Sequence, residues 1–165
     1  MPADIDVVVL TARHSISGRL LLDQRLSDFL NDRQYTALNL RETKIARLND
    51  PSRVLQQHEE SVIQKTWAVV AFEPPRKGTN VGQRLFGYVP KMRHEVFLVL
   101  EGMEVRGTLH TAGPLDLRRM LATTSDSFVP ITQAVVSLYE NDRYVIEQEA
   151  IMVNIRLLRY IGTIG

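Results

Sequence analysis

The segment VVVLTARHSISGRLLLDQRLSDFLNDRQYTALNLRETKIARL, residues 7–48, carries the pattern from which the fold is predicted. It begins with Val7–Thr11, which is rich in β-branched residues, and continues with Ile16–Leu22, in which the side chains alternate between two faces. Both features are typical of strands. A short helix is expected next, with Asp23 as its N-cap. Further strands are expected at Tyr35–Leu40 and Lys44–Leu48. The segment therefore predicts a mainly β fold with short helices.

A similar succession returns in VFLVLEGMEVRGTLHTAGPLDLRRMLATTSDSFVPITQAVVSL, residues 96–138. Gly18 and Gly107 occupy the same place in the second strand of each segment, and a glycine inside a strand often marks a bend or a close backbone approach. The second helix is expected to begin at Gly113-Pro114, because proline is common at the first position of a helix. The apolar positions of the two helices correspond: Leu26, Phe29 and Leu30 in the first, and Leu117, Met120 and Leu121 in the second. The sequence therefore predicts an internal duplication of a small β-barrel with one short helix after its second strand.

The ends of the two copies delimit the predicted domains. Each copy is expected to finish in a long apolar strand, Val62–Phe72 in the first and Ala150–Ile161 in the second. The first copy is assigned to residues 1–72 and the second to residues 95–165, with a linker at 73–94. Trp67, in the last strand of the first copy, is expected to lie in the core or at an interface.

Composition excludes several classes of protein. The chain of 165 residues has 44% hydrophobic and 24% charged residues, close to the globular average, so it is not disordered throughout. It has no cysteine, which excludes disulfides, Cys-ligated metals and Cys nucleophiles. No apolar run is long enough for a membrane span, and the start MPADIDVVVL lacks the basic region of a secretion signal. A cytoplasmic protein without membrane insertion is expected.

Catalytic and cofactor-binding motifs are not found in the sequence. The four histidines do not form HExxH, and neither GxSxG nor a phosphate-binding glycine motif occurs. We therefore expect no catalytic residue, no metal and no cofactor, and an enzyme is the least supported of three functional classes. Several of the sixteen arginines alternate with apolar residues along strand-like segments, among them Arg19 and Arg41, where pairing with acids across strands explains them.

The predicted linker has a different composition from its surroundings. Its basic and aromatic residues could contact a partner or a nucleic acid, since aromatic rings stack on bases while cations contact phosphates. The candidate contact residues are Arg76, Lys77, Arg84, Phe86, Tyr88, Lys91 and Arg93. With a net charge of +1, the chain as a whole offers no global attraction for nucleic acid.

Three segments carry a resemblance to a known group of proteins: GRLLLDQRLSDFLN, FVPITQAVVSL and AIMVNIRLLRYI. The chain resembles uncharacterised bacterial proteins with tandem small β-barrels, which are distantly Sm-like. The two copies together cover most of the chain outside the linker. Sm-like proteins proper place their helix before the first strand, whereas here it follows the second, so the resemblance assigns no residue a role.

Two functions are therefore expected from the sequence. The first is a non-catalytic interaction or assembly module, built from two tandem small β-barrels, that binds a protein partner or associates with itself. A duplicated module often descends from a homodimer whose interface became internal. The alternative is a protein that binds RNA or single-stranded nucleic acid through the barrel faces and the basic linker. The salt dependence of oligonucleotide binding separates the two.

Overall fold

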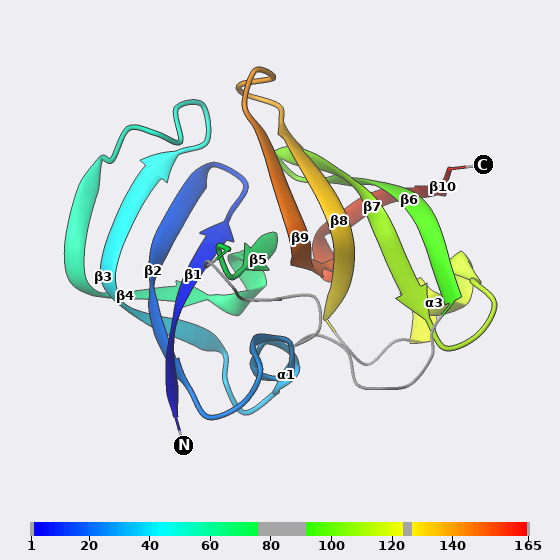
Figure 1. The fold of residues 1–165 in the computed structure, drawn as a ribbon, viewed down its shortest axis with the longest axis horizontal. Coiled ribbons are helices and arrows are strands. Elements are labelled where there is room, and N and C mark those ends of the chain that lie inside the picture. Colours follow the sequence, from blue (N-terminus) through cyan, green and yellow to red (C-terminus); the bar gives the residue numbers. More distant parts are fainter. Residues whose placement is uncertain (1, 76–91, 124–126, 165) are drawn as a thin grey trace.

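The fold is mainly β, as expected, and consists of antiparallel strands in one sheet with two short helices. A computed structural model describes residues 2–75, 92–123 and 127–164. Figure 1 shows two groups of strands side by side, with β5 and β9 where they meet.

The first half contains five strands and one α-helix. Its elements are β1 (Ala3–Leu10), β2 (His14–Leu22), α1 (Leu26–Asn31), β3 (Ala37–Arg47), β4 (Gln56–Gln64), the 3₁₀ turn η1 (Lys65–Trp67) and β5 (Val70–Phe72). The second half has the elements β6 (Met92–Leu100), β7 (Met103–Thr111), α3 (Leu117–Thr123), β8 (Phe128–Leu138), β9 (Val145–Asn154), the 3₁₀ turn η2 (Ile155–Leu157) and β10 (Leu158–Thr163). Residues 3–72 and 92–163 thus have the same order of described elements.

The pairing of strands also repeats. The sheet has the order β10-β6-β7-β8-β9-β5-β1-β2-β3-β4, so each half begins with its last strand and continues through its first four. The halves are joined where β9 pairs with β5. The prediction of two small barrels is wrong in one respect, because the sheet is not closed. The outer edge of β5 is occupied by β9 of the other half, and so β5 does not close onto β4 of its own half.

Several predicted element boundaries need correction. The two strands expected on either side of Glu42 form one long strand, β3, with Glu42 at a positive φ of 51° where the ladder with β2 shifts register. The long strand expected at Val62–Phe72 is interrupted by η1, and the one at Ala150–Ile161 is interrupted by η2.

Both helices begin later than expected. The N-cap of α1 is Arg25 rather than Asp23, and it makes no side-chain capping bond. The second helix, α3, begins at Leu117 rather than at Gly113-Pro114. Since β6 begins at Met92, the last three residues of the predicted 73–94 linker belong to a strand.

The two cores share residues across the junction of the halves. The first core is built mainly from β1–β4 and α1, but it also contains Phe128 and Met152 of the second half. The second core is built mainly from β6–β9, and it takes in Leu10, Leu48 and Val70 of the first half. Because neighbouring residues of a strand face opposite sides, β5 and β9 supply side chains to both cores. The two halves therefore fold against each other rather than as independent units.

The glycines shared by the two second strands permit a close approach between strands, as predicted. A Cβ at Gly18 would lie 2.7 Å from Thr43 Cγ2 and 3.1 Å from the carbonyl oxygen of Arg41. A Cβ at Gly107 would lie 2.5 Å from Ile131 Cγ2 and 2.9 Å from the carbonyl oxygen of Thr132. In both halves the glycine lies where the ladder to the next strand shifts register.

Asn154, the last residue of β9, forms hydrogen bonds between the two halves. Its side chain is 2% exposed, donates to the Ala68 carbonyl oxygen at 2.9 Å and accepts from the Arg156 amide at 3.0 Å. The backbone amide of Asn154 donates to the Val69 carbonyl oxygen at 2.9 Å. One asparagine therefore caps η2 and binds the chain segment that leads into β5.

We expect Asn154→Ala to lower the free energy of unfolding by about 1–3 kcal/mol, because it leaves buried polar groups without their partners. Urea unfolding followed by circular dichroism measures the change. Gln64→Ala is the matched control, since Gln64 ends β4 as Asn154 ends β9, is exposed and makes no capping bond. Equal losses for the two variants would contradict the role assigned to Asn154.

Candidate assembly interface

The junction between the halves shows how this sheet accepts another strand. Val70 pairs with Val153, and Ala71 pairs with Met152. All four side chains are at most 1% exposed. The contact combines backbone hydrogen bonds with complete burial of apolar side chains, which is the arrangement of a stable interface between strands.

The sheet ends at two strands, β4 and β10, which have a paired neighbour on one side only within the described residues. Unpaired edges present rows of backbone donors and acceptors that can pair with another chain. Figure 1 shows β4 on the left side of the molecule and β10 on the right. The two edges are therefore separate surfaces.

The β4 edge carries exposed apolar side chains at its carboxyl end. Val62 is 66% exposed, and Trp67, which follows in η1, is 65% exposed. The prediction that Trp67 lies in the core is wrong, and its location at an interface stays a prediction. The middle of β4 is charged, with Glu59 and Glu60 both exposed, and charge on an edge discourages indiscriminate pairing.

Lys65 anchors the segment that follows β4. It is 8% exposed, and its Nζ donates to the carbonyl oxygens of Phe29 at 2.5 Å and Asp32 at 3.0 Å. The same Nζ lies 4.5 Å from the centre of the Phe29 ring. Burial lowers the pKa of Lys65, and the charge of Asp32 opposes that effect. The ammonium group satisfies carbonyls at the end of α1, so its role here is structural.

The β10 edge carries exposed aromatic side chains. Tyr160 is 58% exposed, and Tyr139, which follows β8, is 50% exposed. Arg159 lies 3.7 Å from Glu101 through its guanidinium group. The pKa of Tyr139 is raised by burial and by the charge of Glu104, while Arg159 lowers it. The β10 edge therefore carries the exposed Tyr160 beside an arginine that is paired with Glu101.

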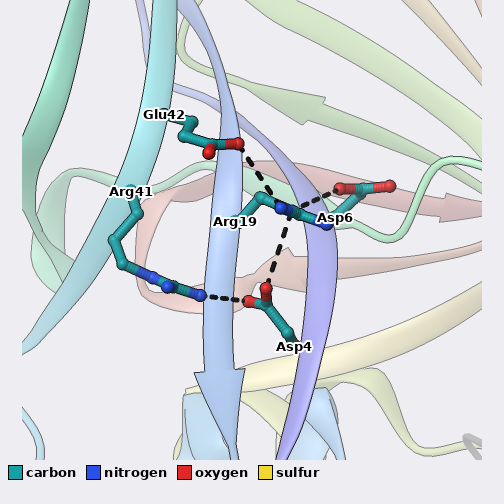
Figure 2. A network of polar contacts seen from close by, with 5 residues as sticks. All are labelled: Asp4, Asp6, Arg19, Arg41 and Glu42. Carbon is teal, nitrogen blue, oxygen red and sulfur yellow. Dashed lines mark hydrogen bonds and ion pairs between the residues drawn. The ribbon is translucent and has the colours of Figure 1, made fainter.

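Arginines on the outer face of the first half are paired with acids, as expected from the sequence. Figure 2 shows Arg19 of β2 between carboxylates of β1 and β3. Its Nε lies 3.6 Å from Asp4 and 3.7 Å from Asp6, and its Nη1 lies 3.5 Å from Glu42. Arg41 contacts Asp4 at 2.5 Å. Three carboxylates face two guanidinium groups in this cluster, so it carries no excess positive charge.

The structure places only one of the candidate contact residues of the linker. Arg76, Lys77, Arg84, Phe86, Tyr88 and Lys91 lie outside the described residues. Arg93 lies in β6, where it is exposed and pairs with His110 of β7. Apart from Trp67, the sequence did not single out the apolar residues of the two edges, because an exposed apolar residue in an alternating strand has the same pattern as a buried one.

Metal-binding side chains do not converge in the described part of the chain. No group of three His, Asp or Glu side chains that could hold a metal ion occurs there. His94 contacts Thr111 at 2.9 Å, and His110 contacts Thr132 at 2.6 Å. Among the described helices, none is long and apolar enough to cross a membrane.

A shallow depression lies at the turn between β3 and β4, lined by Arg47, Asn49, Asp50, Arg53 and Leu55. Its lining includes one carboxylate beside two guanidinium groups, which offsets part of the positive charge. The depression therefore does not define a site for a particular ligand.

Comparison of the chain with protein-family models, with curated proteins and with solved structures gives no match. The sheet edges are thus the features of the described structure on which a functional interpretation rests.

Proposed function

We propose that this chain is a non-catalytic interaction module, built from a duplicated unit, that binds protein partners by adding strands at the edges of its sheet. The observation that carries the proposal is that β4 and β10 each lack a neighbour on one side among the described residues and expose Val62 and Tyr160 respectively. Strand addition is a common mode of recognition, in which backbone hydrogen bonds supply affinity and alternate side chains supply specificity.

The proposed duplication, with one copy in residues 1–72 and the other in 95–165, has structural support. The halves have the same order of elements and the same strand pairing. Val7 pairs with Gly18 as Val96 pairs with Gly107. Gln133 of β8 has a positive φ of 48°, as Glu42 of β3 has one of 51°. The proposed relationship to Sm-like proteins rests on the sequence segments alone.

Selection from a random peptide library displayed on phage tests the proposed function. We expect the chain to enrich peptides with alternating apolar residues, because one face of an added strand would cover the apolar edge. Binding of these peptides should fall on Val62→Glu or on Tyr160→Glu, and it should persist on Leu21→Glu. Leu21 is a suitable control because it is 58% exposed but lies on β2 inside the sheet.

Failure to enrich peptides, or enrichment that is insensitive to both edge substitutions, would contradict the proposal. The nucleic-acid alternative has its own measurement, a titration with random single-stranded oligonucleotides at several salt concentrations. A steep fall of log affinity with log salt would favour that alternative and direct attention to residues 73–94.

A further inference from the structure

We propose that the partner of these edges is a second copy of the chain, with β4 of one copy paired to β10 of the next in the register that β9 and β5 use within the chain. The proposal rests on the proposed function, since it names the partner of the same edges. Its basis is that the internal junction and the two open edges are built from equivalent strands.

The equivalence of the strands follows from their pairing. Leu10 pairs with Val70, and the corresponding residue Val99 pairs with Tyr160, so β10 stands in the second half where β5 stands in the first. Likewise, Ala37 pairs with Gln64 as Phe128 pairs with Asn154, so β4 is equivalent to β9. Since β9 pairs with β5 inside the chain, the equivalent strands β4 and β10 could pair in the same way between two chains.

The register of the proposed contact can be stated residue by residue. Val153 pairs with Val70 at the junction, which corresponds to Ile63 against Tyr160 of the next copy. Met152 pairs with Ala71, which corresponds to Val62 against Ile161. Continued along β10, this register places Ser61 opposite Gly162 and Glu60 opposite Thr163, beyond the two pairs that the junction itself forms.

Exposure of the equivalent residues supports a missing partner. Met152 is 1% exposed at the junction, whereas its equivalent Val62 is 66% exposed. Val70 is 0% exposed, whereas its equivalent Tyr160 is 58% exposed. The open edges thus expose apolar or aromatic residues at the positions that are buried at the junction. A second copy would cover them.

A third pair of equivalent residues, Leu48 and Tyr139, shows the same difference in exposure outside the edge strands. Leu48 and Tyr139 each follow the last residue of a strand, and their amides donate to Arg13 at 2.9 Å and to Gly102 at 3.1 Å. Leu48 is 1% exposed and belongs to the core of the other half, whereas Tyr139 is 50% exposed. By the same equivalence, the surface that would receive the next copy includes Tyr139, which lies at the turn between β6 and β7.

The contact is heterologous, since two different surfaces meet, and each added copy presents a new open edge until the assembly closes. A mixing experiment tests this directly. Val62→Glu blocks the β4 edge, and Tyr160→Glu blocks the β10 edge. Because both side chains are largely exposed, we expect both variants to remain folded, which their thermal midpoints would verify.

Sedimentation velocity over a range of concentrations measures the assembly. We expect the unmodified chain to form species larger than a dimer and each variant alone to weaken association at least about tenfold, because a charge on a strand edge opposes pairing. An equimolar mixture of the two variants should form a one-to-one dimer, since one intact β4 edge meets one intact β10 edge. Leu21→Glu should assemble like the unmodified chain.

A chain that stays monomeric at its highest soluble concentration overturns the proposal. A variant that alone associates as strongly as the unmodified chain, or a mixture that associates no better than its components, overturns it as well. Peptide selection distinguishes these failures from failure of the proposed function. If the edges bind selected peptides while the chain stays monomeric, the edges serve a different partner and only the second-copy inference is wrong.

Discussion

Leu30→Ala is expected to lower the free energy of unfolding by about 2–5 kcal/mol, the usual cost of emptying a buried leucine site. Leu30 lies in α1, is 3% exposed and belongs to the first core. Its loss would leave a cavity between the helix and the sheet, and close-packed neighbours fill such a cavity only in part. Urea unfolding followed by tryptophan fluorescence or circular dichroism measures the change.

Leu121→Ala provides the matched control for this experiment. From the sequence, Leu121 is the counterpart of Leu30 and was predicted to anchor its helix equally well. In the structure Leu121 is 45% exposed, so that prediction is wrong and we expect a loss within about 0.5 kcal/mol. Similar losses at both positions would show that α3 packs as tightly as α1.

Gly102→Ala is expected to be the more disruptive of two glycine-to-alanine changes in connections between regular elements. Gly102 has a φ of +86°, which side-chain-bearing residues rarely adopt, and a Cβ there would collide with the carbonyl oxygen of Ala12. The backbone conformation alone costs roughly 1–3 kcal/mol for a non-glycine residue. Overlap with a backbone atom that must move adds a cost of about 1–3 kcal/mol.

The position of Ala12 makes this a test of how the halves meet, because Ala12 follows β1 whereas Gly102 connects β6 to β7. Gly113→Ala is the control, since a Cβ at Gly113 meets no atom within 4 Å. Thermal unfolding of the two variants measures the difference. A Gly102→Ala variant as stable as the Gly113→Ala variant would contradict both the positive φ of Gly102 and its close approach to Ala12.

Local features of the fold were predictable from the sequence because they depend on neighbouring residues. The alternation in Ile16–Leu22 and the helical spacing of Leu26, Phe29 and Leu30 identified β2 and α1. The glycines at 18 and 107 indicated the close strand approach that the structure contains. The pairing of Arg19 and Arg41 with acids followed from charges alternating on adjacent strands.

The candidate interface was much less predictable. Val62 and Tyr160 are apolar or aromatic residues in strand-like segments, and such residues were assigned to long continuous strands at the ends of the copies. Burial depends on what covers a residue, and that partner lies far away in the sequence or in another molecule. For this reason Met152 is buried and its equivalent Val62 is exposed, although their local patterns are alike.

The mainly β class and the succession of two strands and a helix that opens each half follow from side-chain period and backbone sterics within a few residues. That the sheet stays open depends on contacts between residues far apart in the sequence. The short turns η1 and η2 interrupt the apolar segments, and the pairing of β5 with β9, rather than with β4, joins the halves. Pairing of β5 with β9 rather than with β4 depends on backbone hydrogen bonds and burial between residues far apart in the sequence. Local periodicity does not reveal such contacts.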